Sequence, residues 1–128
     1  ALMQAAAIQA VLPPGKRVGI LTISADTLTE THLAAAGVPE GTPVAGVADG
    51  CEFQRAILGN ALTLDVEEAR ADLAAAAKAF QANHPGLGAI LLECTNMPPY
   101  KKAIAEATGL PIFSIETYVK WLVESLPR

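Results

Sequence analysis

The sequence is poor in aromatic residues, in cysteine and in positive charge. Aromatic side chains make up 5% of its 128 residues, there are two cysteines, and the net charge is −4. Two cysteines are too few for a disulfide framework in a chain that can build its own core. An acidic balance argues against nucleic acid, because phosphate binding requires a basic surface. We therefore expect free thiols, a reducing cytoplasm and no nucleic-acid partner.

Several other features are missing. No apolar run approaches the roughly 20 residues that cross a bilayer, and no signal peptide is evident, so we expect no membrane partner. A Cys-x5-Arg phosphatase loop is excluded because Tyr100 stands where its arginine would be. His32 and His84 have no partner at metal-ligand spacing, so surface histidines are favoured over a zinc site and we expect no metal.

Apolar strand-like runs alternate with helical segments along the chain. Strands are expected over residues 18–24, 43–48, 88–94 and 111–115. Helices are expected over residues 1–12, 30–36, 51–58, 65–83 and 98–108, followed by a final helix. This alternation is typical of a parallel sheet with right-handed crossovers. The sequence therefore predicts one α/β unit over residues 1–128, with a parallel four-stranded sheet and helices on both faces.

Local signals refine the helices. Thr29 is expected to cap the helix that follows it, and Asp65 with Glu68 three residues later forms a capping-box-like start for the longest one. The final helix is expected to turn its apolar residues inward. These residues are Val119, Leu122, Val123 and Leu126.

The first twelve residues form a helical segment without a capping residue before it, and position 1 is not methionine. A processed terminus is one explanation, and we favour a chain cut from a longer protein. Apolar surface that a missing part would cover should then promote self-association. The residues expected to be exposed are Leu2, Val11, Leu12 and Trp121.

Ligands of open parallel sheets bind at the carboxyl ends of the strands, near the point where the strand order reverses. That rule selects residues 22–26, 49–51, 94–96 and 114–116, which are rich in hydroxyls, thiols and acids. A strand order 2-1-3-4 would make the first and third strands neighbours. Ser24 is then expected to face Cys94.

The most informative stretch surrounds Cys94. Thr95 or Asn96 can cap the helix that Pro98 opens, and a cysteine just before a helix feels its positive dipole, which favours the thiolate. The same N–H groups can bind a carboxylate. A buried structural thiol is the alternative. Glu93 could orient a thiol or an amine, as could Glu116, although solvated acids are commoner at strand ends.

Residues 91–100 resemble the second cysteine motif of the aspartate/glutamate racemase superfamily, with Cys94-Thr95-Asn96 as the most specific part. Residues 12–22 resemble the start of that family's second half, and residues 109–115 resemble its closing strand. The resemblance implies one lobe of a two-lobe enzyme that needs no cofactor. In that family a thiol from each lobe moves a proton at the carbon next to a carboxylate.

The resemblance assigns roles residue by residue. Cys94 would be one of the two thiols, and the small carboxylate substrate would be held by Thr95 and Asn96, with Ser24 and Thr22 as weaker candidates. The first-lobe cysteine has no counterpart, and Cys51 is the sole other thiol. An aspartate- or glutamate-like racemase or epimerase is the leading hypothesis. A one-cysteine decarboxylase, a cis–trans isomerase of dicarboxylates and a non-catalytic binding or assembly module remain as alternatives.

Overall fold

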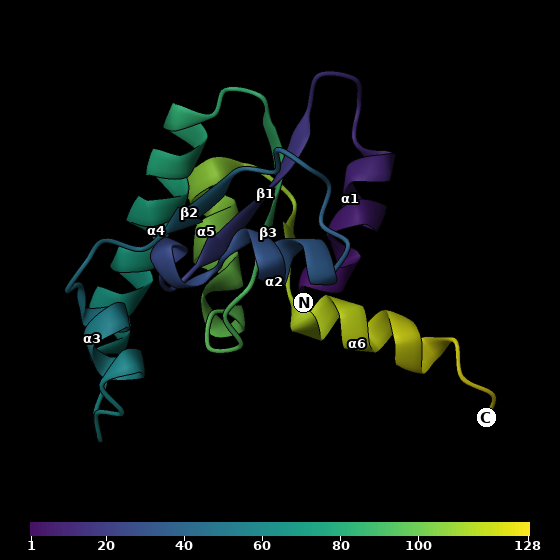
Figure 1. Cartoon of the computed structure of the whole chain (residues 1–128). Helices are drawn as coiled ribbons and strands as arrows, with labels where there is room; N and C mark the ends of the chain where they lie inside the picture. The colour runs from purple at the N-terminus through teal and green to yellow at the C-terminus, as the bar shows by residue number, and fades with distance from the viewer.

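The computed structural model describes all 128 residues and confirms the α/β architecture. Its centre is a parallel sheet with the strand order β2-β1-β3-β4 (Figure 1). The strands are β1 (Arg17–Thr22), β2 (Val44–Gly46), β3 (Leu87–Leu92) and β4 (Ile112–Phe113). Each lies within about two residues of its expected position, and the neighbouring strands β1 and β3 form the middle of the sheet.

Helices cover both faces of the sheet (Figure 1). One face packs against α1 (Ala5–Val11) and α2 (Glu30–Ala35). The other packs against α3 (Glu52–Leu58), α4 (Val66–Asn83) and α5 (Lys101–Thr108). Short 3₁₀ helices lie at Leu2–Gln4, Ala25–Thr27 and Pro98–Tyr100. None of the helices combines the length and hydrophobicity that a bilayer span requires.

Side chains of β1 and β3 alternate between the two faces, as the pleat requires. Ile20 and Leu91 belong to the core on the α1–α2 side, whereas Leu21 and Leu92 belong to the core on the α4–α5 side. Gly19 lacks a side chain where Phe80 of α4 presses against β1, and an added Cβ would collide with that ring. Burial on both faces explains why these strands are apolar throughout.

The predicted N-caps of α2 and α4 are confirmed. Thr29 is the N-cap of α2, where its backbone N–H donates to Nδ1 of His32 at 3.3 Å. The Asp65 carboxylate accepts from the backbone N–H of Glu68 at 3.0 Å at the start of α4. Both devices satisfy N–H groups that the first turn of a helix leaves free.

The prediction that the final helix turns its apolar residues inward is wrong. Helix α6 (Ile115–Glu124) has no buried residue and extends away from the body of the protein (Figure 1). Val119, Leu122, Val123 and Leu126 are all exposed, because no other element of this chain packs over them. At the start of the helix, the Gln4 side chain donates to the Ser114 carbonyl at 2.8 Å.

Candidate functional site

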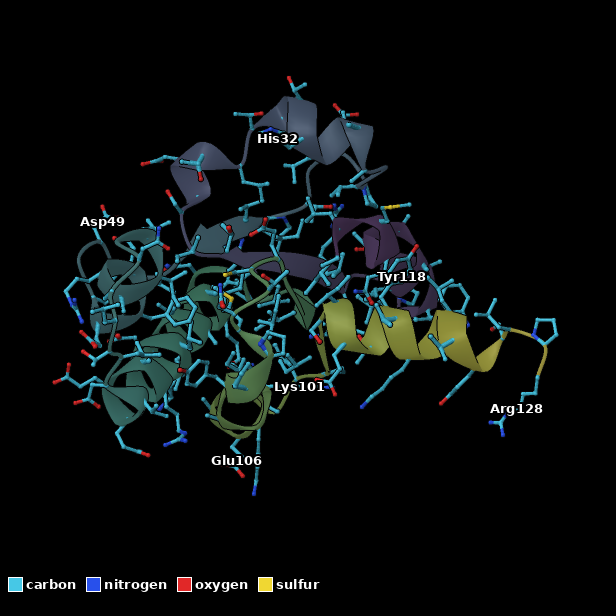
Figure 2. All side chains as sticks on the ribbon, turned by 90° about the horizontal axis from the view of Figure 1, so that it is seen from below. His32, Asp49, Lys101, Glu106, Tyr118 and Arg128 are labelled. Atoms are coloured by element: carbon cyan, nitrogen blue, oxygen red, sulfur yellow. The ribbon has the colours of Figure 1, made fainter.

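The site lies where the strand order reverses. From β1 the chain crosses to β2 on one side, and from β3 it crosses to β4 on the other, so the reversal falls between β1 and β3. Figure 2 looks from below, with Asp49, which follows β2, on the left and Tyr118 of α6 to the right of the centre. Of the four expected segments, residues 22–26 and 94–96 therefore flank the reversal.

The register of β1 against β3 decides which side chains meet. Leu21 pairs with Leu92, which places Thr22 beside Glu93. The Thr22 hydroxyl donates to Oε2 of Glu93 at 2.9 Å, and Thr22 is 2% exposed. This hydrogen bond joins the two central strands at their carboxyl ends.

The expected facing of Ser24 and Cys94 stays a prediction, because the paired register of β1 and β3 ends at Leu21 and Leu92 and Ser24 lies beyond β1. Ile23 and Cys94 both pack against the core on the α4–α5 side.

Cys94 is half-buried at the end of the central strand. Its carbonyl accepts from the backbone N–H of Met97 at 3.1 Å, which closes a tight turn containing Thr95 and Asn96. Both turn residues are exposed, and Nδ2 of Asn96 lies 4.0 Å from the Cys94 sulfur. A partly accessible thiol thus has an amide donor beside it and free polar groups in the same turn.

The predicted cap of the following helix is wrong. Met97, not Thr95 or Asn96, is the N-cap, and it makes no side-chain hydrogen bond. The two prolines after Met97 open a 3₁₀ turn, and α5 begins only at Lys101. The turn at Cys94 therefore separates the thiol from the first helical residue.

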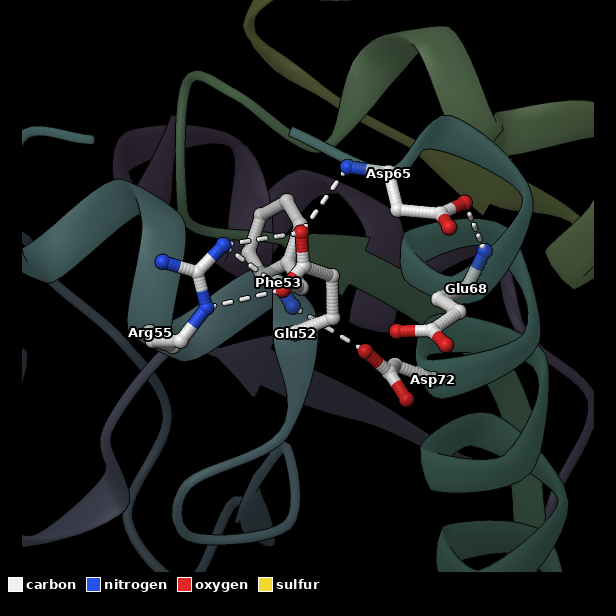
Figure 3. A network of polar contacts seen from close by, with 6 residues as sticks. All are labelled: Glu52, Phe53, Arg55, Asp65, Glu68 and Asp72. Carbon is white, nitrogen blue, oxygen red and sulfur yellow. Dashed lines mark hydrogen bonds and ion pairs between the residues drawn. The ribbon is translucent and has the colours of Figure 1, made fainter. Parts of the chain in front are cut away.

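Cys51 lies in a different setting, at the N-cap of α3. Burial raises the pKa of the Cys51 thiol above its ordinary value, and the nearby Asp72 carboxylate raises it further. Asp72 is fixed because it accepts from the backbone N–H of Phe53 at 3.0 Å (Figure 3). Cys51 consequently keeps its proton at neutral pH and is a poor base.

Helices α3 and α4 are joined by side-chain hydrogen bonds (Figure 3), and Cys51 is the N-cap of α3. The Glu52 carboxylate of α3 accepts from the backbone N–H of Asp65 at 2.8 Å and from the Arg55 guanidinium at 2.8 and 3.0 Å. These contacts lower the pKa of Glu52, with the Asp65 N–H as the largest cause. In return, the Asp72 carboxylate of α4 accepts a hydrogen bond from the backbone N–H of Phe53 in the first turn of α3. The network fixes the loop that carries Cys51.

A cavity of about 580 Å³ lies at the carboxyl ends of β1 and β3, on the α1–α2 side. Thr22, Glu93 and His32 supply polar groups to its lining, and Cys94 does not line it.

His32 was expected to be an ordinary surface residue, and only its place in α2 brings it to the cavity. Glu93 was expected to be a solvated acid, but its carboxylate accepts a hydrogen bond from Thr22. Glu116 is a solvated acid as expected, since it forms an ion pair with Lys120 at 2.7 Å on the surface of α6. No group of three or more His, Cys, Asp or Glu side chains is placed to hold a metal.

Comparisons with known proteins bear on this site. Residues 1–119 match the family model described as Asp/Glu/Hydantoin racemase. A dimethylsulfoniopropionate lyase of Durusdinium sp. clade D is 36% identical over 69 residues, which are 51% of this chain and 23% of that protein. Dimethylsulfoniopropionate lyase 5 of Emiliania huxleyi is 36% identical over 77 residues, or 57% of this chain and 15% of that protein. The chain thus spans less than a quarter of either relative.

Among solved structures, a liganded double mutant of arylmalonate decarboxylase superposes with a TM-score of 0.50. The match covers 85% of this chain and 46% of that chain, at 20% sequence identity. At that identity the likeness establishes the fold.

Proposed function

This chain belongs to the Asp/Glu/hydantoin racemase family, and from that premise we propose that Cys94 moves a proton at the carbon next to a substrate carboxylate. The substrate we propose is a small aspartate- or glutamate-like acid. Its carboxylate would be bound by the exposed turn of Thr95 and Asn96. Thr22 lines the cavity on the α1–α2 side, which Cys94 does not line, so Thr22 is a weaker candidate for that contact, as is Ser24.

The position of Cys94 is the observation that carries the proposal. The thiol is partly accessible, follows the central strand β3 and lies at the reversal of strand order. The amide of Asn96, 4.0 Å from the sulfur, is a donor that stabilises negative charge there. Cys51 lacks these advantages, since burial and Asp72 keep its proton in place.

The Cys94 thiolate takes the α-proton, and the electron pair of the C–H bond moves into the carboxylate to give an enediolate. Return of a proton to the same face regenerates the substrate, and return to the opposite face inverts the carbon. Inversion needs a second acid on the far side of the substrate. We propose that another lobe or a second copy of the chain supplies it.

A one-thiol reaction is the second candidate, favoured by the presence of one thiol at the reversal point. In decarboxylation the C–C bond to the departing CO₂ breaks, and the Cys94 thiol protonates the resulting enediolate. In a lyase reaction the thiolate removes the α-proton and a leaving group departs from the next carbon. Neither reaction requires an acid on the opposite face.

Product analysis separates these candidates. The chain would be incubated with L-aspartate, L-glutamate, malonate and maleate in D₂O, and the products followed by NMR and chiral chromatography. Deuterium incorporation without inversion indicates a lone working thiol, and inversion indicates that a second acid is present. Loss of CO₂ from malonate favours the decarboxylase. Absence of every reaction, also at high protein concentration, would contradict the proposed chemistry.

A further inference from the structure

The Glu93 carboxylate lines the cavity on the α1–α2 side without a cationic partner. The protein has four ion pairs, and Glu93 takes part in none of them. No lysine or arginine lines the cavity, and Glu93 is its only acid. A half-buried carboxylate without a counter-charge can gain free energy by binding a cation.

The carboxylate is held in a fixed orientation. Oε2 of Glu93 accepts from the hydroxyl of Thr22, and Thr22 itself is buried in β1. The backbone N–H of Glu93 donates to the Leu21 carbonyl at 2.9 Å, which fixes the main chain as well. No protein donor contacts the other carboxylate oxygen, Oε1. A ligand that binds there meets a group whose orientation is already set, which reduces the entropic cost of binding.

The remaining walls favour an organic cation over a bare metal ion. Leu2, Met3, Ile23 and Leu28 make the lining largely apolar. No cluster of metal-ligating side chains lies nearby. An ammonium group can donate to the Glu93 carboxylate while its carbon substituents contact these walls.

We propose that the cavity is a binding site for a small organic cation, with the Glu93 carboxylate, oriented by Thr22, as its charged contact. The site is distinct from the thiol, because Cys94 does not line the cavity and packs against the core on the α4–α5 side. Helix α2 and α5 lie on opposite sides in Figure 2, where His32 and Lys101 mark them. The proposal is therefore independent of the role assigned to Cys94.

The test uses three ligands of similar size, which are n-propylammonium, 1-propanol and propionate. Each is titrated into the ¹⁵N-labelled chain, and chemical shifts of the Thr22, His32 and Glu93 amides are followed. Propylammonium is expected to shift these amides saturably and to bind at least about tenfold more tightly than propanol or propionate, as expected for a charge-assisted hydrogen bond.

Two variants and two controls make the test specific. Glu93→Gln keeps the size and the acceptor for Thr22 but removes the charge, and should weaken propylammonium binding about tenfold. Thr22→Val leaves the charge but frees the carboxylate, and should weaken binding by a smaller factor. Glu116→Gln, on the exposed surface of α6, and Cys94→Ser should leave binding unchanged. Thermal unfolding of each variant verifies that the fold is intact.

Three results would overturn the proposal. In the first, Glu93→Gln binds propylammonium as tightly as the parent chain does. In the second, propionate binds as tightly as propylammonium at the same amides. In the third, propylammonium causes no saturable shifts at tens of millimolar concentrations. Loss of turnover in Cys94→Ser with unchanged cation binding would support it. That pattern also separates this site from the proposed catalytic one.

Discussion

Thr22 and Glu93 end the two central strands side by side, and the Thr22 hydroxyl donates to Oε2 of Glu93 at 2.9 Å. Because this donor is buried and its acceptor is charged, Thr22→Val should lower the free energy of unfolding by about 1–2 kcal/mol. Thr27→Val is the matched control, since the exposed Thr27 hydroxyl donates to a neutral carbonyl, that of Ser24. Urea denaturation measures both variants, and an equal loss would contradict a special role for the Thr22–Glu93 contact.

The two cysteines should differ in reactivity. Burial and the Asp72 carboxylate raise the pKa of Cys51, so little thiolate is available there at neutral pH. Cys94 is expected to react with iodoacetamide about fivefold faster or more at pH 7. Peptide mass spectrometry resolves the two rates, and Asp72→Asn should narrow the difference by accelerating Cys51. Faster alkylation of Cys51 in the parent chain would refute this expectation.

Glu52 should stabilise the protein only above acidic pH. The Asp65 N–H and Arg55 lower the pKa of Glu52 in the folded state below the value of about 4.3 for an unfolded chain. Its contribution is therefore complete above that value and is lost as the pH falls through the lower folded pKa.

Replacement of Glu52 measures this contribution. Glu52→Gln should unfold more easily than the parent chain at pH 7, and the difference should shrink towards pH 3. Exposed Glu40, which makes no side-chain hydrogen bond, provides the control variant Glu40→Gln. A stability difference that stays constant from pH 7 to pH 3 would rule out the carboxylate network as its source.

The apolar surface of α1 and α6 should drive self-association. Trp121 is 61% exposed and Val11 is 78% exposed, as predicted from the sequence, whereas Leu2 and Leu12 are half-buried. We propose that a second copy of the chain covers this surface. Trp121→Ser should shift sedimentation towards the monomer, and Leu62→Ser, at a fully exposed leucine between α3 and α4, should not. A strictly monomeric parent chain at high concentration would contradict the proposal.

The sequence predicted the elements well because their signals are local. Proline and glycine after residue 12 end the first helix, Thr29 and Asp65 cap theirs, and apolar runs mark the buried strands. Alternation of strand and helix predicts a parallel sheet, whereas the strand order 2-1-3-4 was only assumed from the sequence and is given by the structure. The resemblance to the racemase family is confirmed by the family match over residues 1–119, and the cysteine motif at residues 91–100 stays a prediction.

The site was harder to predict because it depends on register. A shift of one residue between β1 and β3 exchanges the faces of every side chain, and the observed register brings Glu93 to Thr22. No local signal in either strand fixes that register. The predicted N-cap at Thr95 or Asn96 was wrong because Pro98 and Pro99 open a 3₁₀ turn directly after Met97. The prediction that α6 turns its apolar residues inward assumed that another part of this chain packs over them, and none does.

The central claim is that the Cys94 sulfur exchanges a proton with carbon. The most direct measurement is the rate at which the α-hydrogen of aspartate or glutamate is replaced by deuterium in D₂O, compared among the parent chain, Cys94→Ser and Cys51→Ser. We expect exchange above the buffer rate, a loss of about 100-fold or more in Cys94→Ser, and little change in Cys51→Ser. Exchange by Cys94→Ser at the rate of the parent chain would contradict it.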